Sequence, residues 1–235
     1  YGGGRRFRTP RGTVVKTYIG FIIVVLLLSF VLMIYFKPYV KLVKPLLIAV
    51  LITPTALLIL PLFNPWNTVK FVICLISTVT ILSLSAFHIF KDNLKIFIST
   101  CLLSTGIILL DTFLGNPLMR VSILGYDPIV GARFYGIGNE YMGFLLGTTI
   151  VGTAALIDKY RDQGKLLKAV SIIIYAIVLI TLMLPTLGTN VGGTMAAFIG
   201  LGTATLLHLK RKITQKDFTL LGCLLLIFLL ILFIY

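Results

Sequence analysis

Hydrophobic positions in this chain form long, nearly uninterrupted runs separated by short polar segments. Each run approaches the roughly 20 residues that an α-helix needs to cross a bilayer, and the short alternating segments of an outer-membrane barrel are not seen. The pattern therefore predicts an all-α, polytopic transmembrane helical bundle of about eight spans. The predicted spans are Tyr18–Phe36, Leu46–Phe63, Phe71–Phe90, Ile96–Gly115, Glu140–Ile157, Ala169–Pro185, Gly192–Leu209 and Leu220–Tyr235.

The second predicted span differs from the others because Pro54 and Pro61 interrupt it. Proline has no backbone N–H, so each residue removes one donor from the helical ladder. We expect this segment to be kinked or re-entrant. Every later topological assignment depends on whether it crosses.

Composition agrees with a protein of the lipid bilayer. Hydrophobic residues make up 58% of the 235 positions and charged residues 12%, with a mean hydropathy of +1.07. Soluble domains contain about 25% charged residues. The net charge of +14 does not indicate nucleic-acid binding, because the basic residues are spread over many loops and form no patch with aromatic side chains.

The distribution of basic residues predicts a topology. Thirteen lysines and arginines follow the odd-numbered spans, and three follow the even-numbered spans. By the positive-inside rule the first set of loops is cytoplasmic. The segments Arg120–Glu140 and Thr186–Val191 then face outside a cell membrane that the chain crosses many times.

The ends of the chain suggest a piece of a longer protein. It begins with Tyr1 and ends within an apolar run at Tyr235. Residues 1–17 are interpreted as a flexible basic extracytoplasmic linker, although their five basic residues by themselves favour a cytoplasmic start. Residues 18–235 are interpreted as one transmembrane helical domain.

Ionisable residues gather between the fourth and fifth spans, in the segment Asn116–Gly143. Ionisable groups at membrane depth are costly, so such a cluster is a hypothesis for a functional site. The candidate site residues here are Arg120, Asp127, Arg133, Asn139 and Glu140, with Asp111 just upstream.

Each charged residue of this cluster has a functional and a structural interpretation. Arg120 and Arg133 carry planar guanidinium groups suited to a substrate phosphate or carboxylate, or they neutralise the nearby acids. Glu140 and Asp127 are the candidate catalytic residues, acting in proton transfer or in cation binding. Alternatively, Glu140 has only a structural role, because the positive end of the helix dipole favours a carboxylate in the first turn.

Two asparagines complete the candidate substrate-binding set. Asn139 stands at the expected N-cap of the fifth span. Asn190 belongs to a second motif, Pro185–Thr194, which precedes the seventh span. We expect Asn190 to lie beside Asn139 or Glu140 in a shared outer cavity.

Small residues in the two motifs predict close contact between spans five and seven. A weak repeat supports this, since Gly147–Ala155 aligns with Gly188–Ala196 at an offset of 41 residues. The predicted structural glycines are Gly143, Gly147, Gly188, Gly192 and Gly193.

Other chemistry is sparse. Cys74, Cys101 and Cys223 lie singly within apolar runs and are predicted core residues, and no metal spacing is present. His88 and His208 stand near the ends of their spans and are not predicted ligands. The sequence contains no nucleophile motif or phosphate-binding loop, so a reaction type and a cofactor remain unknown.

Ser122–Gly143, SILGYDPIVGARFYGIGNEYMG, together with LGTNVGGT at Leu187–Thr194, resembles an uncharacterised family of multi-spanning bacterial membrane proteins. In some members of that family a similar membrane region is joined to an exported domain like alkaline phosphatases or sulfatases. The resemblance implies an upstream domain and an outside N-terminus, and it implies no catalytic mechanism.

Three functions remain open at this stage. The chain is the membrane module of a cell-envelope enzyme, with an outward site for a phosphate-bearing or lipid-linked anion. Alternatively, it is a transporter or flippase, although its ionisable residues lie at one face and transporters concentrate polar groups near the midplane. The third option is a structural anchor for an upstream exported domain.

Overall fold

The computed structural model describes residues 11–35, 40–64, 68–125, 135–210 and 214–234, and these residues form helices and connections without a strand. The predicted all-α architecture is therefore confirmed. Its helices are α1 (Arg11–Tyr35), α2 (Val40–Ile59), α3 (Thr68–Ile89), α4 (Asn93–Phe113), α5 (Asn139–Lys159), α6 (Gly164–Met183), α7 (Val191–Leu209) and α8 (Gln215–Ile234). Because α1 begins at Arg11, the last part of the predicted linker is helical.

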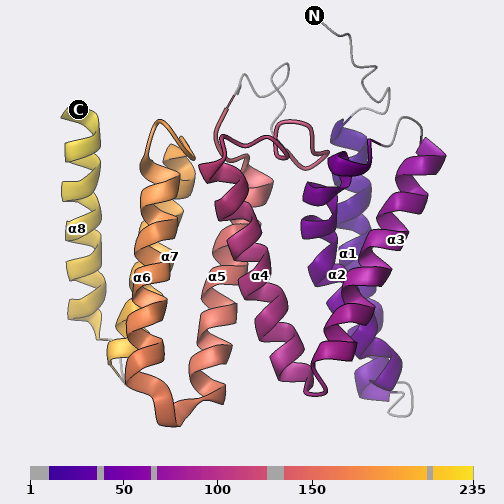
Figure 1. Cartoon of the computed structure of the whole chain (residues 1–235). Helices are drawn as coiled ribbons and strands as arrows, with labels where there is room; N and C mark the ends of the chain where they lie inside the picture. Colours follow the sequence, from indigo (N-terminus) through magenta and orange to yellow (C-terminus); the bar gives the residue numbers. More distant parts are fainter. Residues whose placement is uncertain (1–10, 36–39, 65–67, 126–134, 211–213, 235) are drawn as a thin grey trace, which may run out of the picture.

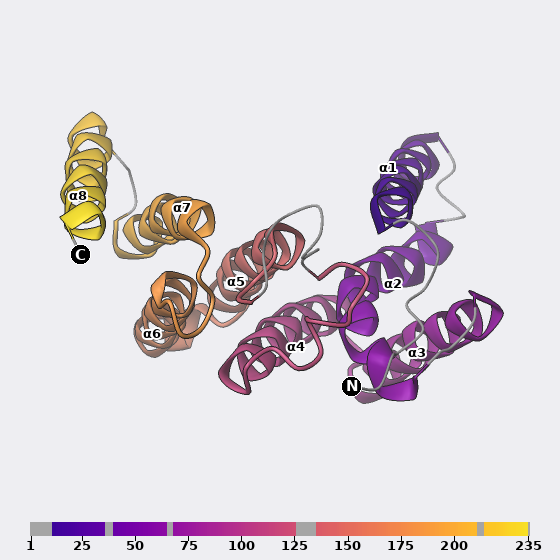
Figure 2. The ribbon, with the colours of Figure 1, turned by 90° about the horizontal axis from the view of Figure 1, so that it is seen from above.

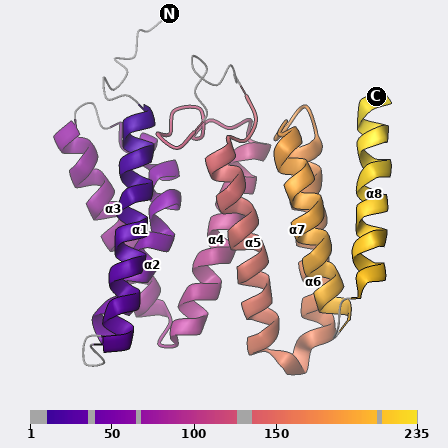
Figure 3. The same ribbon diagram turned by 180° about the vertical axis from the view of Figure 1, so that it is seen from behind.

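The helices run alternately in opposite directions and stand side by side in a row (Figure 1). Viewed from above, the row extends from α1, α2 and α3 through α4 and α5 to α6, α7 and α8 (Figure 2). We call the end at which α2, α4 and α6 finish the motif end. The end at which α1, α3, α5 and α7 finish is the basic end, and the view from behind shows the same division (Figure 3).

Six helical segments of the described chain are long and apolar enough to cross a membrane: Val43–Phe63, Val69–Ile89, Asn93–Phe113, Asn139–Lys159, Arg161–Met183 and Val191–Leu209. In α1 a shorter apolar segment, Ile19–Tyr35, accompanies them. The chain is therefore a multi-pass membrane protein, and the exact number of eight spans stays a prediction.

The second predicted span forms a continuous helical segment and does not turn back as a re-entrant segment would. Helix α2 continues through Pro54 and then tightens into a 3₁₀ turn, Leu60–Phe63, in which Pro61 occupies an early position. An early position suits proline, because the first residues of a helix have no intrahelical acceptor for their N–H groups. The whole segment is long enough to cross.

Helices α4 and α5 form the most extensive helix pair of the row. A Cβ atom added to Gly152 of α5 would lie 2.7 Å from the Cβ atom of Cys101 on α4, so the two backbones approach closely there. The hydroxyl of Thr105 on α4 lies 3.1 Å from that of Thr148 and 3.2 Å from that of Thr149 on α5. Small residues and hydroxyl groups are the usual means of joining helices in lipid, where apolar burial contributes little.

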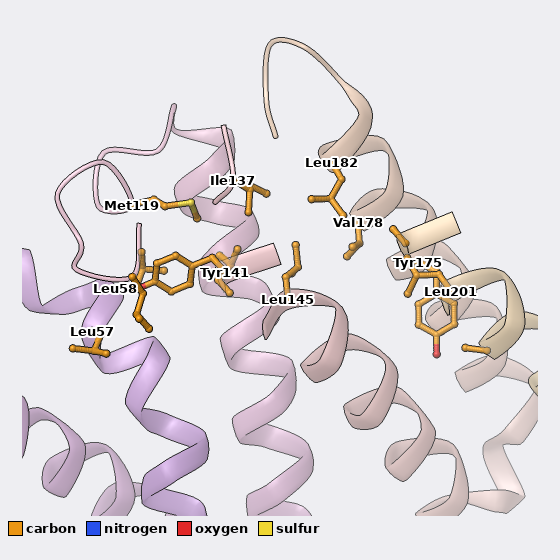
Figure 4. Close-up of a cluster of buried hydrophobic side chains, with 14 of the residues drawn as sticks. Leu57, Leu58, Met119, Ile137, Tyr141, Leu145, Tyr175, Val178, Leu182 and Leu201 are labelled. Carbon is orange, nitrogen blue, oxygen red and sulfur yellow. The ribbon is translucent and has the colours of Figure 1, made fainter. Parts of the chain in front are cut away.

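The main apolar core lies where the helices meet the connection between α4 and α5. Figure 4 shows Leu58 of α2, Met119 of this connection and Tyr141 of α5 packed together, and all three side chains are fully buried. The core continues through α5 and α6 to α7.

The predicted burial of the three cysteines holds for only part of the set. Cys101 is buried at the α4–α5 contact, whereas Cys74 is partly exposed and Cys223 is exposed on α8. Among the described helices, α8 packs mainly against α7. A single neighbouring helix leaves most of its surface uncovered.

Candidate functional site

The connection after α4 is folded back onto the bundle by the carboxylate of Asp111. This side chain is 3% exposed. Its Oδ1 accepts a hydrogen bond of 2.8 Å from the backbone N–H of Leu118, and its Oδ2 accepts one of 3.0 Å from that of Met119. Its backbone oxygen accepts a further bond from the N–H of Asn116, which has a left-handed φ of 61°. Asp111 is thus a satisfied structural carboxylate that positions the start of the motif.

Ser122 fixes the same connection to α2. Pro61 lacks an N–H, so the carbonyl oxygen of Leu57, four residues earlier, has no helical donor. The Ser122 hydroxyl donates to this oxygen at 3.0 Å and lies 2.7 Å from the Tyr141 hydroxyl. The Tyr141 hydroxyl is also 3.3 Å from the carbonyl oxygen of Pro54. The carbonyl oxygens of Leu57 and Pro54 in α2 therefore bind the motif, a role that sequence analysis missed.

The two sequence motifs meet directly at the motif end. The backbone N–H of Ile137, just before α5, donates to the carbonyl oxygen of Gly188 at 2.7 Å. A Cβ atom added to Gly136 would lie 2.2 Å from that same oxygen, and the φ of Gly136 is 83°. Position 136 therefore requires glycine twice over, once for space and once for its left-handed backbone.

Asn190 completes the junction with three hydrogen bonds. Its Nδ2 donates to the Ile137 carbonyl oxygen at 2.9 Å and to Asn139 Oδ1 at 3.3 Å. Its Oδ1 accepts from the backbone N–H of Gly193 at 2.7 Å, which caps the start of α7. The predicted proximity of Asn190 to Asn139 is confirmed. The side chain of Asn190 is 2% exposed, so its amide is used inside the protein.

The N-cap of α5 differs from the expected one. Asn139 is the first residue of α5, and Gly138, which has no side chain to cap, holds the N-cap position. The prediction that Asn139 caps this helix is therefore wrong. Asn190, in contrast, is the N-cap of α7. Thr189 before it has a left-handed φ of 45°, which is an outlier for a β-branched residue.

The charged candidate residues Arg120 and Glu140 are exposed, unlike the buried Asn190. Glu140 is exposed in the first turn of α5, and Arg120 is exposed in the connection after α4. Both belong to the motif end, and within the described residues neither forms an ion pair. Asp127 and Arg133 lie outside the described residues, so their predicted roles stay predictions.

Only some of the predicted structural glycines are at close contacts. A Cβ atom at Gly188 would lie 2.5 Å from the carbonyl oxygen of Thr181, and one at Gly193 would lie 2.6 Å from Met142 Cγ on α5. At Gly143 and Gly147 a Cβ atom would meet nothing within 4 Å, and at Gly192 its nearest neighbour would be 3.9 Å away. Among the described residues, the expected close contact is therefore not found at these last three positions.

The 41-residue repeat does not describe the arrangement of the two helices. Helices α5 and α7 do run in the same direction and contact each other. Their starts at Asn139 and Val191 are, however, 52 residues apart. Gly147 consequently lies inside α5, whereas its aligned partner Gly188 precedes α7.

The shared outer cavity stays a prediction, because only part of the motif belongs to the described residues. Among these residues no group of three or more His, Cys, Asp or Glu side chains could hold a metal ion. A surface depression lined by Leu84, Ser85, His88 and Ile89 lies on α3 towards the basic end. It contains none of the candidate residues.

One acidic residue at the basic end has a different role. Asp92 caps the start of α4, since its Oδ1 accepts a 2.9 Å hydrogen bond from the Leu94 N–H. It also pairs with Lys159 at the end of α5. The hydrogen bond from Lys159, followed by that from Leu94, holds the pKa of Asp92 below its ordinary value. This pair closes the α4–α5 hairpin at the end opposite to the motifs.

The motif end therefore combines a buried asparagine junction, two adjacent helix starts and an exposed arginine and glutamate. Helix starts with unpaired N–H groups attract anions, whereas the exposed carboxylate of Glu140 places a negative charge at the start of α5. No family model, no curated protein and no solved structure matches this chain.

Proposed function

We propose that this membrane-embedded chain is the membrane module of a bacterial cell-envelope protein and that its motif end binds an anionic, phosphate-bearing or lipid-linked group. The motif end would face outward, because the basic loops at the opposite end favour the cytoplasm. An upstream exported domain fits this orientation.

The observation that carries the proposal is the junction of the two motifs. Asn190 ties the start of α7 to Ile137 and Asn139, so the positive ends of two parallel helix dipoles stand side by side. Each dipole is equivalent to roughly half a positive charge at its start. Gly138 adds no side-chain cap to α5. An anion at this place would gain from both helices.

Two further features support a binding role over plain anchoring. Thr189 and Asn116 hold left-handed backbone conformations at the motif end, and strained backbone of this kind clusters at functional sites, at a cost of about 1–3 kcal/mol each. Arg120 supplies an exposed guanidinium in the same region. We propose that it contacts the bound anion.

A transporter or flippase is the alternative. The hydroxyl groups between α4 and α5 supply some polarity away from the helix ends, but Thr148 and Thr149 also donate to backbone carbonyl oxygens within α5. Groups that are saturated in this way favour a packing role over a transport path. A structural anchor without a ligand is the third possibility.

The proposal is tested by ligand-induced stabilisation of the chain in nanodiscs of neutral lipid. Inorganic pyrophosphate represents a soluble phosphate, and nanodiscs that include phosphatidic acid represent a lipid headgroup. A ligand at 100 times its Kd stabilises by about 2.7 kcal/mol, which is about 5–10 °C in Tm for a protein of this size. We expect at least one of the two probes to produce such a shift.

Arg120→Gln should abolish the shift, and the matched control is Lys95→Gln, which removes an exposed cation at the basic end. Stabilisation that survives Arg120→Gln but is lost in Lys95→Gln would place the anion site at the wrong end. If neither probe raises Tm, the anchor interpretation is preferred.

A further inference from the structure

Helices α5, α6 and α7 are joined near the basic end by a chain of short polar contacts that the motifs do not include. The phenol oxygen of Tyr175 on α6 lies 2.9 Å from Nε2 of His208 on α7 and 2.5 Å from the hydroxyl oxygen of Thr153 on α5. The hydroxyl oxygen of Thr153 lies 2.7 Å from the carbonyl oxygen of Thr149. The Tyr175 and His208 rings are stacked, with centroids 5.8 Å apart.

The number of available hydrogens decides which group donates in each of these polar contacts. Thr153 Oγ1 also lies 3.1 Å from the Ile150 carbonyl oxygen, and one hydrogen can serve both carbonyl oxygens. Together with the two contacts of the Tyr175 oxygen, the arrangement needs three hydrogens, and the two hydroxyl groups supply one each. If Nε2 of His208 were bare, Tyr175 would donate to it and Thr153 would donate to Tyr175. The oxygen atoms of Thr153 and Thr149 would then face each other at 2.7 Å with no hydrogen between them. A hydrogen on Nε2 removes this repulsion, because each contact then has a donor.

We infer that His208 carries a hydrogen on Nε2 and that each group donates to the next, from His208 to Tyr175 to Thr153 to the Thr149 carbonyl oxygen. We call this series of hydrogen bonds the latch. Tyr175 is 3% exposed and Thr153 is fully buried, so water does not compete for the bond between them, whereas His208 is partly exposed. The latch holds α6 and α7 against α5.

The latch and the asparagine junction act at opposite ends of the same helices. Asn190 joins the start of α7 to the start of α5, and the latch joins the last turn of α7 to α6 and α5. Apolar burial is a weak force between helices in lipid, so polar contacts decide their alignment. Movement of α7 along α5 by one helical turn would break both connections, and this pair of contacts therefore fixes the register of the α5–α6–α7 unit.

The hydrogen on Nε2 is observable by 15N NMR of the protein with labelled histidine. The chain contains two histidines, so His88→Gln leaves His208 as the single signal source. The spectrum should be recorded at about pH 8, well above the ordinary histidine pKa of about 6.5. We expect a protonated-type signal for Nε2. A bare Nε2 would overturn the inferred direction.

Thr153→Val provides the sharper test, since valine has nearly the shape of threonine but cannot accept a hydrogen bond. Tyr175 then has no acceptor on α5 and should turn its hydrogen towards His208, so Nε2 should become bare. An Nε2 signal that stays protonated in this variant would show that these hydrogen bonds do not set the tautomer of His208.

Stability gives a second and independent readout. Tyr175→Phe keeps the stacked ring but removes both oxygen contacts, and we expect the folded-to-unfolded ratio in detergent to fall about 3- to 15-fold. The matched control is Tyr160→Phe, at a residue that is 37% exposed at the end of α5. Equal stability of the two variants would refute the latch.

Discussion

Replacing Gly152 by alanine tests the close contact between α4 and α5. The new Cβ atom would lie 2.7 Å from the Cβ atom of Cys101 and 3.4 Å from Cδ2 of Leu102, both on α4. Carbon atoms prefer separations of about 3.5–4.0 Å, so the backbones of α4 and α5 must move apart by about 1 Å. A Cβ atom cannot rotate away as the end of a long side chain can.

The expected cost follows from overpacking in well-packed interiors. Such insertions destabilise by about 1–3 kcal/mol, and one kcal/mol corresponds to about 2–4 °C in Tm for a chain of this length. We therefore expect Gly152→Ala to lower Tm in detergent by about 2–12 °C. The same change at Gly147, where a Cβ atom meets nothing within 4 Å, should leave Tm unchanged or slightly raised, because alanine is the better helix former.

A double-mutant cycle identifies the contact responsible. Cys101→Gly removes the opposing Cβ atom, so it should cost less stability in the Gly152→Ala background than in the wild-type chain. If Gly147→Ala and Gly152→Ala have equal Tm values, or if the two changes at the contact are additive, the close approach of α4 and α5 is refuted.

Three other outcomes are expected. In a chain free of its native cysteines, Thr189→Cys should react with a membrane-impermeant thiol reagent in intact cells, whereas Gln163→Cys should not; the opposite labelling would reverse the proposed orientation. Lys159→Met should destabilise at pH 7. The folded-state pKa of Asp92 is lowered, so the stability lost in this variant is fully present above the unfolded pKa of about 3.9. The loss should shrink as the pH falls through the folded-state pKa. A loss of stability that persists in acid would exclude the ion pair as its cause. Asn190→Ala should cost about 1–3 kcal/mol in unfolding measurements, since it leaves the buried Ile137 carbonyl without its donor, and a loss below 0.5 kcal/mol would count against the junction.

The sequence by itself determined the class of the protein and most of its helices. Runs of apolar residues near the length of a bilayer leave few alternatives, because every backbone polar group in lipid must be paired within its own segment. The eight described helices overlap the eight predicted spans. Their alternating directions follow from short connections, so the basic residues after odd spans belong to one end. The side of the membrane that this end faces is a prediction from charge alone.

The tertiary structure decided which motif residues are structural. The structural role of Ser122 depends on α2, since its hydroxyl donates to a carbonyl oxygen that Pro61 leaves without a helical donor. The same hydroxyl contacts Tyr141, and Asp111 positions the start of this connection. A sequence pattern marks the prolines as interruptions and gives no sign of which side chain uses the freed acceptor. The contact joins residues 65 positions apart.

The glycines and the asparagines illustrate the same limit. Spacing predicted helix contact at Gly147, Gly192 and Gly193, whereas the close approaches between helices are at Gly152 and Gly193. Local rules also favoured Asn139 as a cap, but Asn190 takes that role for its own helix. The rotation of each helix about its axis depends on side-chain packing between helices. That rotation is set only when all neighbours are in place, and the sequence of a single apolar helix does not specify it.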